Sequence, residues 1–127
     1  MRQNNWQIGL EGENAVKKQL LLDDFILIDS NFQYYRSGLR GRMGEIDLIF
    51  IKNKVLHFIE VKTRQSQLYG PAAGQINRAK LKHLYSAIAY FLIKHKEYKN
   101  MQMQFDVAIV TPSKVEIIWN AYQFDNM

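Results

Sequence analysis

The stretch of sequence that decides the fold is GEIDLIFIKNKVLHFIEVKTR, residues 44–64. Two runs within it, 44–52 and 55–64, are rich in branched and aromatic residues, as is typical of β-strands. Asn53 and Lys54 separate the runs, and asparagine tolerates the positive φ angle that a two-residue hairpin turn requires. The stretch therefore predicts a tight antiparallel hairpin.

The length of the turn also sets which residues face each other. A two-residue turn places Asp47 opposite Glu60 and Glu45 opposite Lys62. Because side chains alternate along a strand, we expect these four to share one face, followed toward the turn by apolar residues such as Ile49. Opposed Cβ atoms lie roughly 4.5–5.5 Å apart, so the two carboxylates can share one divalent ion.

The opposed acids point to a metal site for phosphate chemistry. Like charges that face each other across a sheet are destabilising without a counter-ion, and a divalent cation between Asp47 and Glu60 would supply one. Such a cation lowers the pKa of bound water and polarises a phosphoryl oxygen. Lys62 would orient the attacking water or stabilise charge on the scissile phosphate. An ordinary cross-strand ion pair beside a solvated strand end is the alternative that the sequence leaves open.

The composition restricts the metal and the partners. The chain has no cysteine, which excludes a disulfide scaffold, a thiol nucleophile and a zinc-thiolate site. Its three histidines show no zinc-ligand spacing. A site built from carboxylate oxygens favours Mg²⁺ or Mn²⁺. The net charge of +5 favours polyanionic partners such as nucleic acid.

We expect one domain over residues 1–127, with a mixed sheet. The length suits a single core, and no segment resembles a linker. The N-terminus lacks the apolar segment of a signal peptide, and the apolar runs are too short for a membrane span, which predicts a cytoplasmic protein with no membrane partner. Beyond the hairpin, the patterns predict helices at 7–22 and 75–97 and strands at 25–32, 103–111 and 114–119. Strands in runs with flanking helices predict an α/β sandwich.

A third carboxylate is expected to come from the first helix. Glu13 borders the apolar stripe that includes Val16 and Leu20, so it can face the sheet, and Gly9 and Gly12 permit a close approach to a strand. Glu13 is therefore a candidate metal ligand beside Asp47 and Glu60. A solvated surface position is the alternative for Glu13.

At this point the chain resembles a known superfamily. An aspartate followed by Glu-x-Lys on two adjacent strands, after a helix with a glutamate, resembles the PD-(D/E)XK nucleases, which include Holliday-junction resolvases and restriction enzymes. The segments at residues 9–15, 44–49, 58–64 and 105–107 are similar to the YraN family of small bacterial proteins. One departure is Gln104, where a basic residue commonly precedes Phe105.

The resemblance implies a restriction-endonuclease-like (Holliday-junction-resolvase-like) α-β-β-β-α-β core with a mixed sheet flanked by helices. It implies that Asp47, Glu60 and Lys62 are the catalytic positions, with Glu13 assisting. It also singles out Lys80, on the second long helix, as a nucleic-acid-binding position, for which a solvated helix flank is the alternative. Junction-cutting relatives are often dimers, so a homodimer is an open alternative.

Arginines near the predicted site are candidates for nucleic-acid binding. Arg36, Arg40 and Arg42 lie in a basic loop that also holds tyrosines, and arginine contacts phosphates while tyrosine stacks on unpaired bases. Arg64 directly follows the Glu-x-Lys strand and can hold a phosphate near the metal. Solvated surface arginines are the alternative for both places.

Together these features predict a magnesium-dependent endonuclease that hydrolyses phosphodiester bonds in DNA, including branched or unusual structures. The alternative is a non-catalytic nucleic-acid-binding module that keeps the fold and the basic surface. A third class, an interaction protein with no nucleic-acid role, would bind no polynucleotide at low salt.

Overall fold

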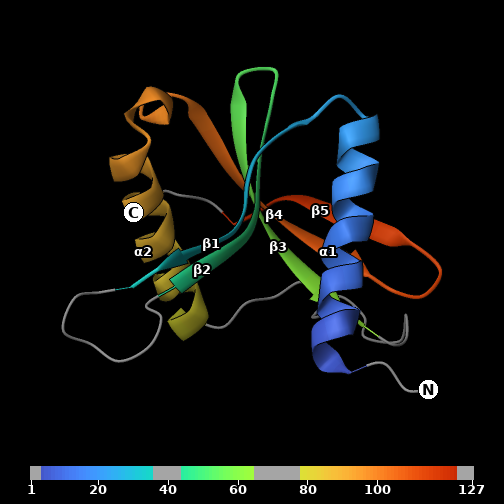
Figure 1. Ribbon diagram of the computed structural model, residues 1–127. Helices are drawn as coiled ribbons and strands as arrows, with labels where there is room; N and C mark the ends of the chain where they lie inside the picture. The colour runs from blue at the N-terminus through green and yellow to red at the C-terminus, as the bar shows by residue number, and fades with distance from the viewer. Residues whose placement is uncertain (1–3, 36–43, 65–77, 123–127) are drawn as a thin grey trace.

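A five-stranded sheet lies between two helices in a computed structural model that describes residues 4–35, 44–64 and 78–122 (Figure 1). In chain order the elements are α1 (Asn5–Leu22), β1 (Ile26–Tyr34), β2 (Gly44–Lys52), β3 (Val55–Thr63), α2 (Arg78–Lys94), the short 3-10 helix η3 (Lys96–Tyr98), β4 (Gln102–Val110) and β5 (Val115–Tyr122). In the described residues, no helix is both long and apolar enough to cross a bilayer.

The strands lie side by side in their chain order, β1 to β5. All neighbours are antiparallel except β3 and β4, which run parallel because the chain between them includes α2. A parallel neighbour requires such a crossover, and helices usually provide it. The predicted α/β architecture with a mixed sheet and flanking helices is confirmed, and it is compatible with a restriction-endonuclease-like core.

The central hairpin has the predicted turn. Asn53 and Lys54 have φ angles of 52° and 64°, as a two-residue turn of the mirror-image type requires. The paired residues run from Lys52 opposite Val55 to Leu48 opposite Ile59, so the predicted register is confirmed over this span.

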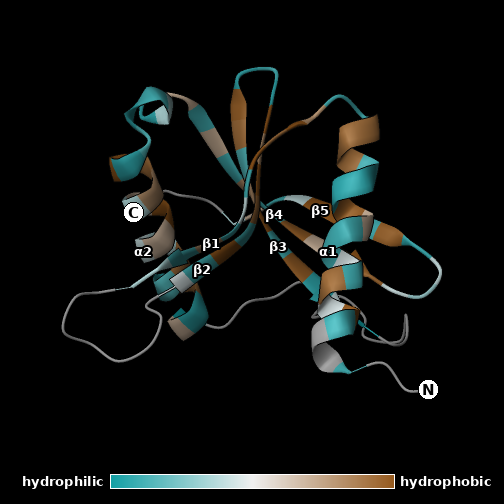
Figure 2. Ribbon diagram, in the orientation of Figure 1, coloured by the Kyte–Doolittle hydropathy of each residue, from teal (hydrophilic) through white to brown (hydrophobic). Residues whose placement is uncertain are grey.

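Each face of the sheet packs against one helix. On the α2 side, Phe58 and Phe105 pack with Ile88 and Phe91 of the helix. On the α1 side, residues such as Phe50 and Ala108 pack with Val16 and Leu20. Figure 2 shows the corresponding hydrophobic segments along the inner strands. Burying apolar surface on both faces is the main source of stability for such a sandwich.

Several element boundaries differ from the expected ones. The helix expected at 75–97 ends at Lys94, because His95 leaves the helical region with φ −124° and ψ 72°, and η3 follows. Residues 75–77 lie outside the described part of the chain. The last strand was expected at 114–119 but continues to Tyr122.

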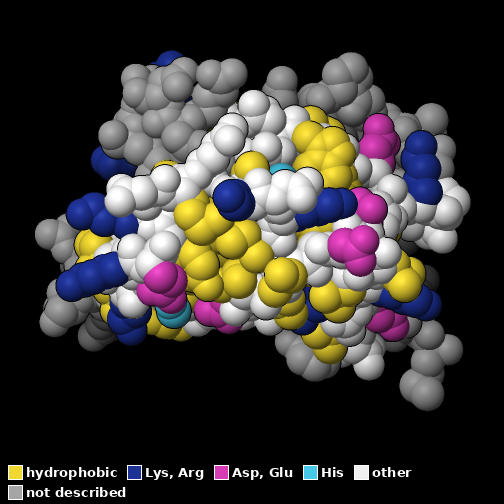
Figure 3. Space-filling view, turned by 90° about the horizontal axis from the view of Figure 1, so that it is seen from above, with side chains coloured by type: hydrophobic (Ala, Val, Ile, Leu, Met, Phe, Trp, Pro, Cys, Tyr) yellow, Lys and Arg dark blue, Asp and Glu magenta, His cyan; other side chains and the backbone are white. Residues whose placement is uncertain are grey.

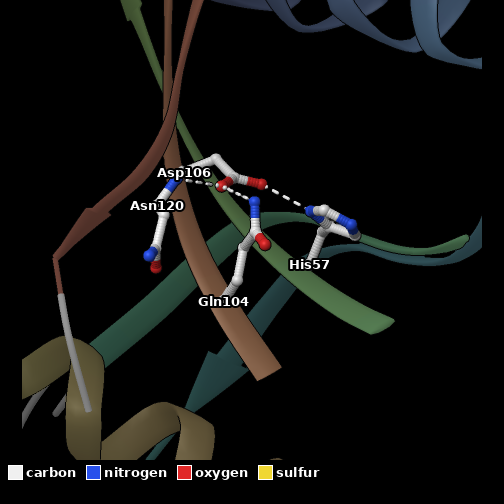
Figure 4. A network of polar contacts seen from close by, with 4 residues as sticks. All are labelled: His57, Gln104, Asp106 and Asn120. Atoms are coloured by element: carbon white, nitrogen blue, oxygen red, sulfur yellow. Dashed lines mark hydrogen bonds and ion pairs between the residues drawn. The ribbon is translucent and has the colours of Figure 1, made fainter. Parts of the chain in front are cut away.

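The extended last strand is held by a buried polar network (Figure 4). Asp106 is fully buried, and its carboxylate accepts hydrogen bonds from the backbone N–H of Asn120 and from Nε2 of Gln104. The second carboxylate oxygen lies 2.7 Å from Nδ1 of His57. The β4–β5 register shifts between Phe105 and Val107, so this carboxylate satisfies polar groups at an irregular point of the sheet.

Candidate functional site

Asp47 lies where the β2–β3 ladder ends. The last paired residues are Leu48 and Ile59, and beyond them Oδ2 of Asp47 accepts the backbone N–H of Val61 at 2.8 Å. Asp47 is only 7% exposed. Its pKa is raised from 3.8 to about 8 by burial and by the negative charge of Glu60, although the hydrogen bond from Val61 acts in the opposite direction. The carboxyl group therefore lies in a site that favours a proton or a cation.

The strict alternation expected along β2 is wrong at this position. Ile46 and Ile49 both pack on the α2 side although they are three residues apart, whereas Leu48 packs on the α1 side. The pairs that β2 makes with β1 bracket Asn31, whose φ angle is 56°. Asparagine adopts this left-handed conformation more readily than most residues. We conclude that the sheet is distorted at Asn31 and Asp47, where the carboxylate replaces regular strand pairing.

Glu60 carries the second buried carboxylate. It is 5% exposed, and its Oε1 lies 2.5 Å from the Nζ atom of Lys80. Lys80 belongs to the first turn of α2, so the helix carries an ammonium group to the end of β3. Burial acts to lower the pKa of Lys80, but the hydrogen bond to Glu60 and the charges of Glu60 and Asp47 raise it overall. The structure thus places Lys80 at the carboxylate pair, a contact that the sequence did not predict.

Glu13 approaches the same group of charges from α1. It is half-buried, and its side chain hydrogen-bonds to Asn31. Burial raises the pKa of Glu13, and the charges of Glu45 and Glu60 raise it further. The expectation that Glu13 faces the sheet is therefore confirmed.

Two glycines let the helices approach the sheet at the site. A Cβ atom on Gly12 would come closer than 3.0 Å to Oγ1 of Thr63, so α1 packs closely on the end of β3. A Cβ atom on Gly44 would overlap the backbone carbonyl of His83 in α2. Close packing at these two points sets the positions of the adjacent acid on α1 and of the first turns of α2.

Lys62 and Arg64 extend the positive charge around the carboxylates. Lys62 is half-buried, and its pKa is lowered by burial and by the charges of Arg64 and Lys80, against the effect of Glu60. Arg64 donates from Nη1 to the carbonyl of Thr63 at 3.1 Å, and its backbone N–H bonds to Val110. Glu45 and Lys62 lie beyond the last pair of the β2–β3 ladder, so their position opposite each other stays a prediction.

The site offers two carboxylates rather than a full set of protein ligands. Such a donor set suits Mg²⁺ or Mn²⁺, which complete their coordination with water. Within the three described ranges, no three His, Cys, Asp or Glu side chains form a group that could hold a metal ion. Mg²⁺ commonly binds one or two carboxylates and keeps several waters. Asp47 and Glu60 match this pattern, and the Lys80 ammonium already occupies a cation position at Glu60. Glu13 does not complete a three-carboxylate group in this structure.

The predicted role of the three loop arginines, Arg36, Arg40 and Arg42, stays a prediction, because they lie outside the described residues. A pocket of about 370 Å³ lies at the hairpin end of the sheet, lined by residues that include Ile26, Ile51, Lys54 and Met101. Figure 3 looks onto this end, where hydrophobic side chains lie between lysines and acids. The carboxylates lie toward the opposite ends of β2 and β3.

Comparison with known sequences assigns the chain to a family. The model of the uncharacterised protein family UPF0102 matches residues 12–110. A UPF0102 protein of Clostridium tetani is 33% identical over 125 residues, which cover 98% of this chain and 90% of the relative. Another, of Petrotoga mobilis, is 39% identical over 88 residues, 69% and 71% of the two chains. These matches confirm the resemblance to a YraN-like uncharacterised family. The chain belongs to the uncharacterised protein family UPF0102.

Proposed function

We propose that this protein is a metal-dependent nuclease that hydrolyses phosphodiester bonds in DNA. The observation that carries the proposal is the pair of buried carboxylates, Asp47 and Glu60, at the end of a sheet beside Lys62 and Lys80. Two neighbouring acids removed from water need a cation or a proton. Lysines beside such acids supply the positive charge that a transferring phosphoryl group needs.

Each residue has a chemical role in this proposal. Asp47 and Glu60 would hold Mg²⁺ or Mn²⁺, and Glu13 would act on the same ion through a water molecule. When bound, the ion supplies Lewis-acid polarisation of the phosphate and activation of water. Lys62, whose pKa is lowered, orients the attacking water and stabilises the developing charge on the phosphate.

The substrate class follows from charge. The net charge of +5 attracts a polyanion, and Arg64 places a guanidinium near Lys62 where it can bind a phosphate. Arg36, Arg40 and Arg42 add a basic segment directly before β2 in the sequence. The net positive charge and the site together favour a nucleic acid, and we propose DNA, with branched structures among the substrates to be tested.

The test is a cleavage assay with labelled duplex, single-stranded and four-way-junction DNA in Mg²⁺ or Mn²⁺. Asp47→Asn and Glu60→Gln keep the shapes of the side chains but remove their charges, and we expect each to reduce cleavage by about 10²-fold or more. Glu116→Gln is the matched control, because its side chain is 60% exposed and pairs only loosely with Lys114 at 3.8 Å.

The control should cut as fast as the unaltered protein. The proposal is wrong if none of the substrates is cut with either metal. It is also wrong if the Asp47 and Glu60 variants cut at the rate of the control, because cleavage would then come from elsewhere or from a contaminant.

The second candidate is a non-catalytic nucleic-acid-binding module. The observation that favours it is the ion pair between Lys80 and Glu60, which satisfies the carboxylate without any metal. It predicts DNA binding that weakens with salt, does not change in Asp47→Asn, and leads to no cleavage. The homodimer implied by junction-cutting relatives is a separate proposal, which light scattering on the purified protein measures directly.

A further inference from the structure

The ion pair between Lys80 and Glu60 joins two very different environments. The Glu60 side chain is 6% exposed, whereas the Lys80 side chain is 52% exposed. The lysine therefore lies along the surface and inserts only its ammonium group toward a buried carboxylate. A lysine side chain has a flexible four-carbon stem, so this ammonium can leave for solvent without unpacking the helix.

The location of Lys80 in α2 is a second reason to assign it a role. The described part of α2 begins with Arg78 and carries Lys80 close behind it, with no acid beside them. Burial disfavours the Lys80 ammonium, whereas its hydrogen bond to Glu60 and the negative charges of Glu60, Asp47 and Glu45 stabilise it.

Lys80 therefore does for the carboxylates what a bound cation would do. It places one positive charge where two buried acids lie close together. A divalent cation that binds Glu60 through Oε1 needs the oxygen that the ammonium already contacts, and it brings twice the charge. The ammonium and the metal ion cannot both lie against Oε1 of Glu60, because each would repel the other at such short range.

We propose that Lys80 is the resident counter-ion of the carboxylate pair and that a divalent cation binds by displacing its ammonium group from Glu60. The inference rests on the metal site of the proposed function. Lys80 is then a positioning residue: it holds the metal-free site in shape and lowers its affinity for the metal. Displacement also releases an ammonium group beside the metal, where a substrate phosphate would meet it.

The test is a calorimetric titration of Mn²⁺ and of Mg²⁺ into the metal-free protein and three variants. Lys80→Gln removes the competing charge and should bind the cation about tenfold more tightly, which corresponds to about 1.4 kcal/mol. Lys80→Arg keeps a cation at the site and should bind no more tightly than the unaltered protein. Lys82→Gln is the matched control, because it removes the same charge from an exposed position in the same helix, and its affinity should change less than twofold.

A second measurement observes the displacement in the unaltered protein. The Nζ resonance of Lys80 in a ¹⁵N-lysine NMR spectrum should move toward that of solvated lysines as Mg²⁺ is added. Mg²⁺ should leave the Nζ resonance of Lys82 in place. This readout depends on neither cleavage nor a substitution.

The outcomes separate the two proposals. If the unaltered protein binds the cation but Lys80→Gln binds it equally or more weakly, displacement is wrong and the metal site stands. An unmoved Lys80 resonance at saturating Mg²⁺ leads to the same conclusion. If neither the unaltered protein nor Lys80→Gln binds Mn²⁺ or Mg²⁺, the metal site fails, and displacement fails with it.

Discussion

At the scale of single residues, Asp47 has the most perturbed environment in the site. Its carboxyl group is almost fully buried beside Glu60, and its pKa is about 8 in the folded protein. In the unfolded chain the same group would titrate near 3.8. The folded state therefore keeps a proton that the unfolded state has already lost over a wide range of pH, and stability must depend on pH across that range.

This difference predicts the sign of the pH dependence. Because the pKa of Asp47 is raised in the folded protein, this group stabilises the folded state most below about pH 4, where it is protonated in both the folded and the unfolded protein. That stabilisation is lost as the pH rises through about 8. In metal chelator, the free energy of unfolding should therefore fall between pH 5 and 8, by at most about 1.4 kcal/mol per pH unit for one proton. Urea denaturation at a series of pH values measures this slope.

Asp47→Asn is the control for that slope, since an amide does not titrate and the fall should flatten in this variant. Saturating Mg²⁺ should also reduce the fall in the free energy of unfolding with pH, because the cation stabilises the ionised carboxylates above pH 7. An equal slope in Asp47→Asn would assign the pH dependence to other groups.

Asp106 is the second buried acid, and its role differs from that of Asp47. Its carboxylate accepts hydrogen bonds from Asn120 and Gln104 and contacts His57, so it connects β3, β4 and β5. Asp106→Asn should cost about 2–5 kcal/mol in urea denaturation, because the amide loses the buried negative charge and places an N–H group, which cannot accept a hydrogen bond, against Nδ1 of His57. Divalent-cation affinity of the folded variant should be unchanged. A loss of affinity without a loss of stability would place Asp106 in the functional site.

At the scale of elements, the sequence predicted what depends on local chemistry. Asn53 and Lys54 fix the hairpin, and the hairpin brings Asp47 and Glu60 to the same end of the sheet. The sequence did not predict the distortion at Asn31, although asparagine is among the residues that most readily adopt a positive φ angle. Strict alternation along β2 predicts that Ile46 and Ile49 lie on opposite faces of the sheet, whereas both pack on the α2 side.

The contact between α1 and β3 predicts opposite effects for two glycines of one helix. Gly12→Ala would force a Cβ atom against Oγ1 of Thr63 and should destabilise the protein by about 1–3 kcal/mol. Gly9→Ala meets nothing within 4 Å and should instead stabilise it by about 0.5–1 kcal/mol, through reduced backbone entropy of the unfolded chain. Thermal and urea unfolding of the two variants measure this difference.

Removing the contacting hydroxyl should restore much of the loss. The double variant Gly12→Ala with Thr63→Ala is expected to be more stable than Gly12→Ala alone, since the added methyl then meets only ordinary van der Waals contacts, with the Cβ atoms of residue 63 and Val110 at 3.7 and 3.8 Å. Equal losses in the single and double variants would mean that Gly12 matters for another reason.

At the scale of the whole molecule, the pairing of Lys80 with Glu60 shows where sequence reasoning ends. The two residues are twenty positions apart, and their contact depends on how α2 is rotated and seated on the sheet. Gly44 contributes to that seating through its contact with His83. No local pattern specifies such a rotation, so a helix flank of alternating lysines looked like a solvated surface or a DNA contact.

The charge of the whole chain predicts how DNA binding responds to salt. With a net charge of +5, the protein should release counterions from the phosphate backbone, and the binding constant should fall steeply as salt rises. Arg64→Gln removes one cation beside the site and should reduce the slope of log K against log salt by about 0.9. Fluorescence anisotropy with labelled DNA measures the slope, and an unchanged slope would remove Arg64 from the interface.

The central claim is that Asp47 and Glu60 hold a divalent cation at the end of the β2–β3 hairpin. Anomalous diffraction from a crystal soaked in Mn²⁺ tests this most directly. The account predicts a manganese peak bound by both carboxylates, with the Lys80 ammonium moved away from Glu60. A fully soaked crystal that shows no peak, with the two carboxylates facing apart and Lys80 still on Glu60, would contradict it.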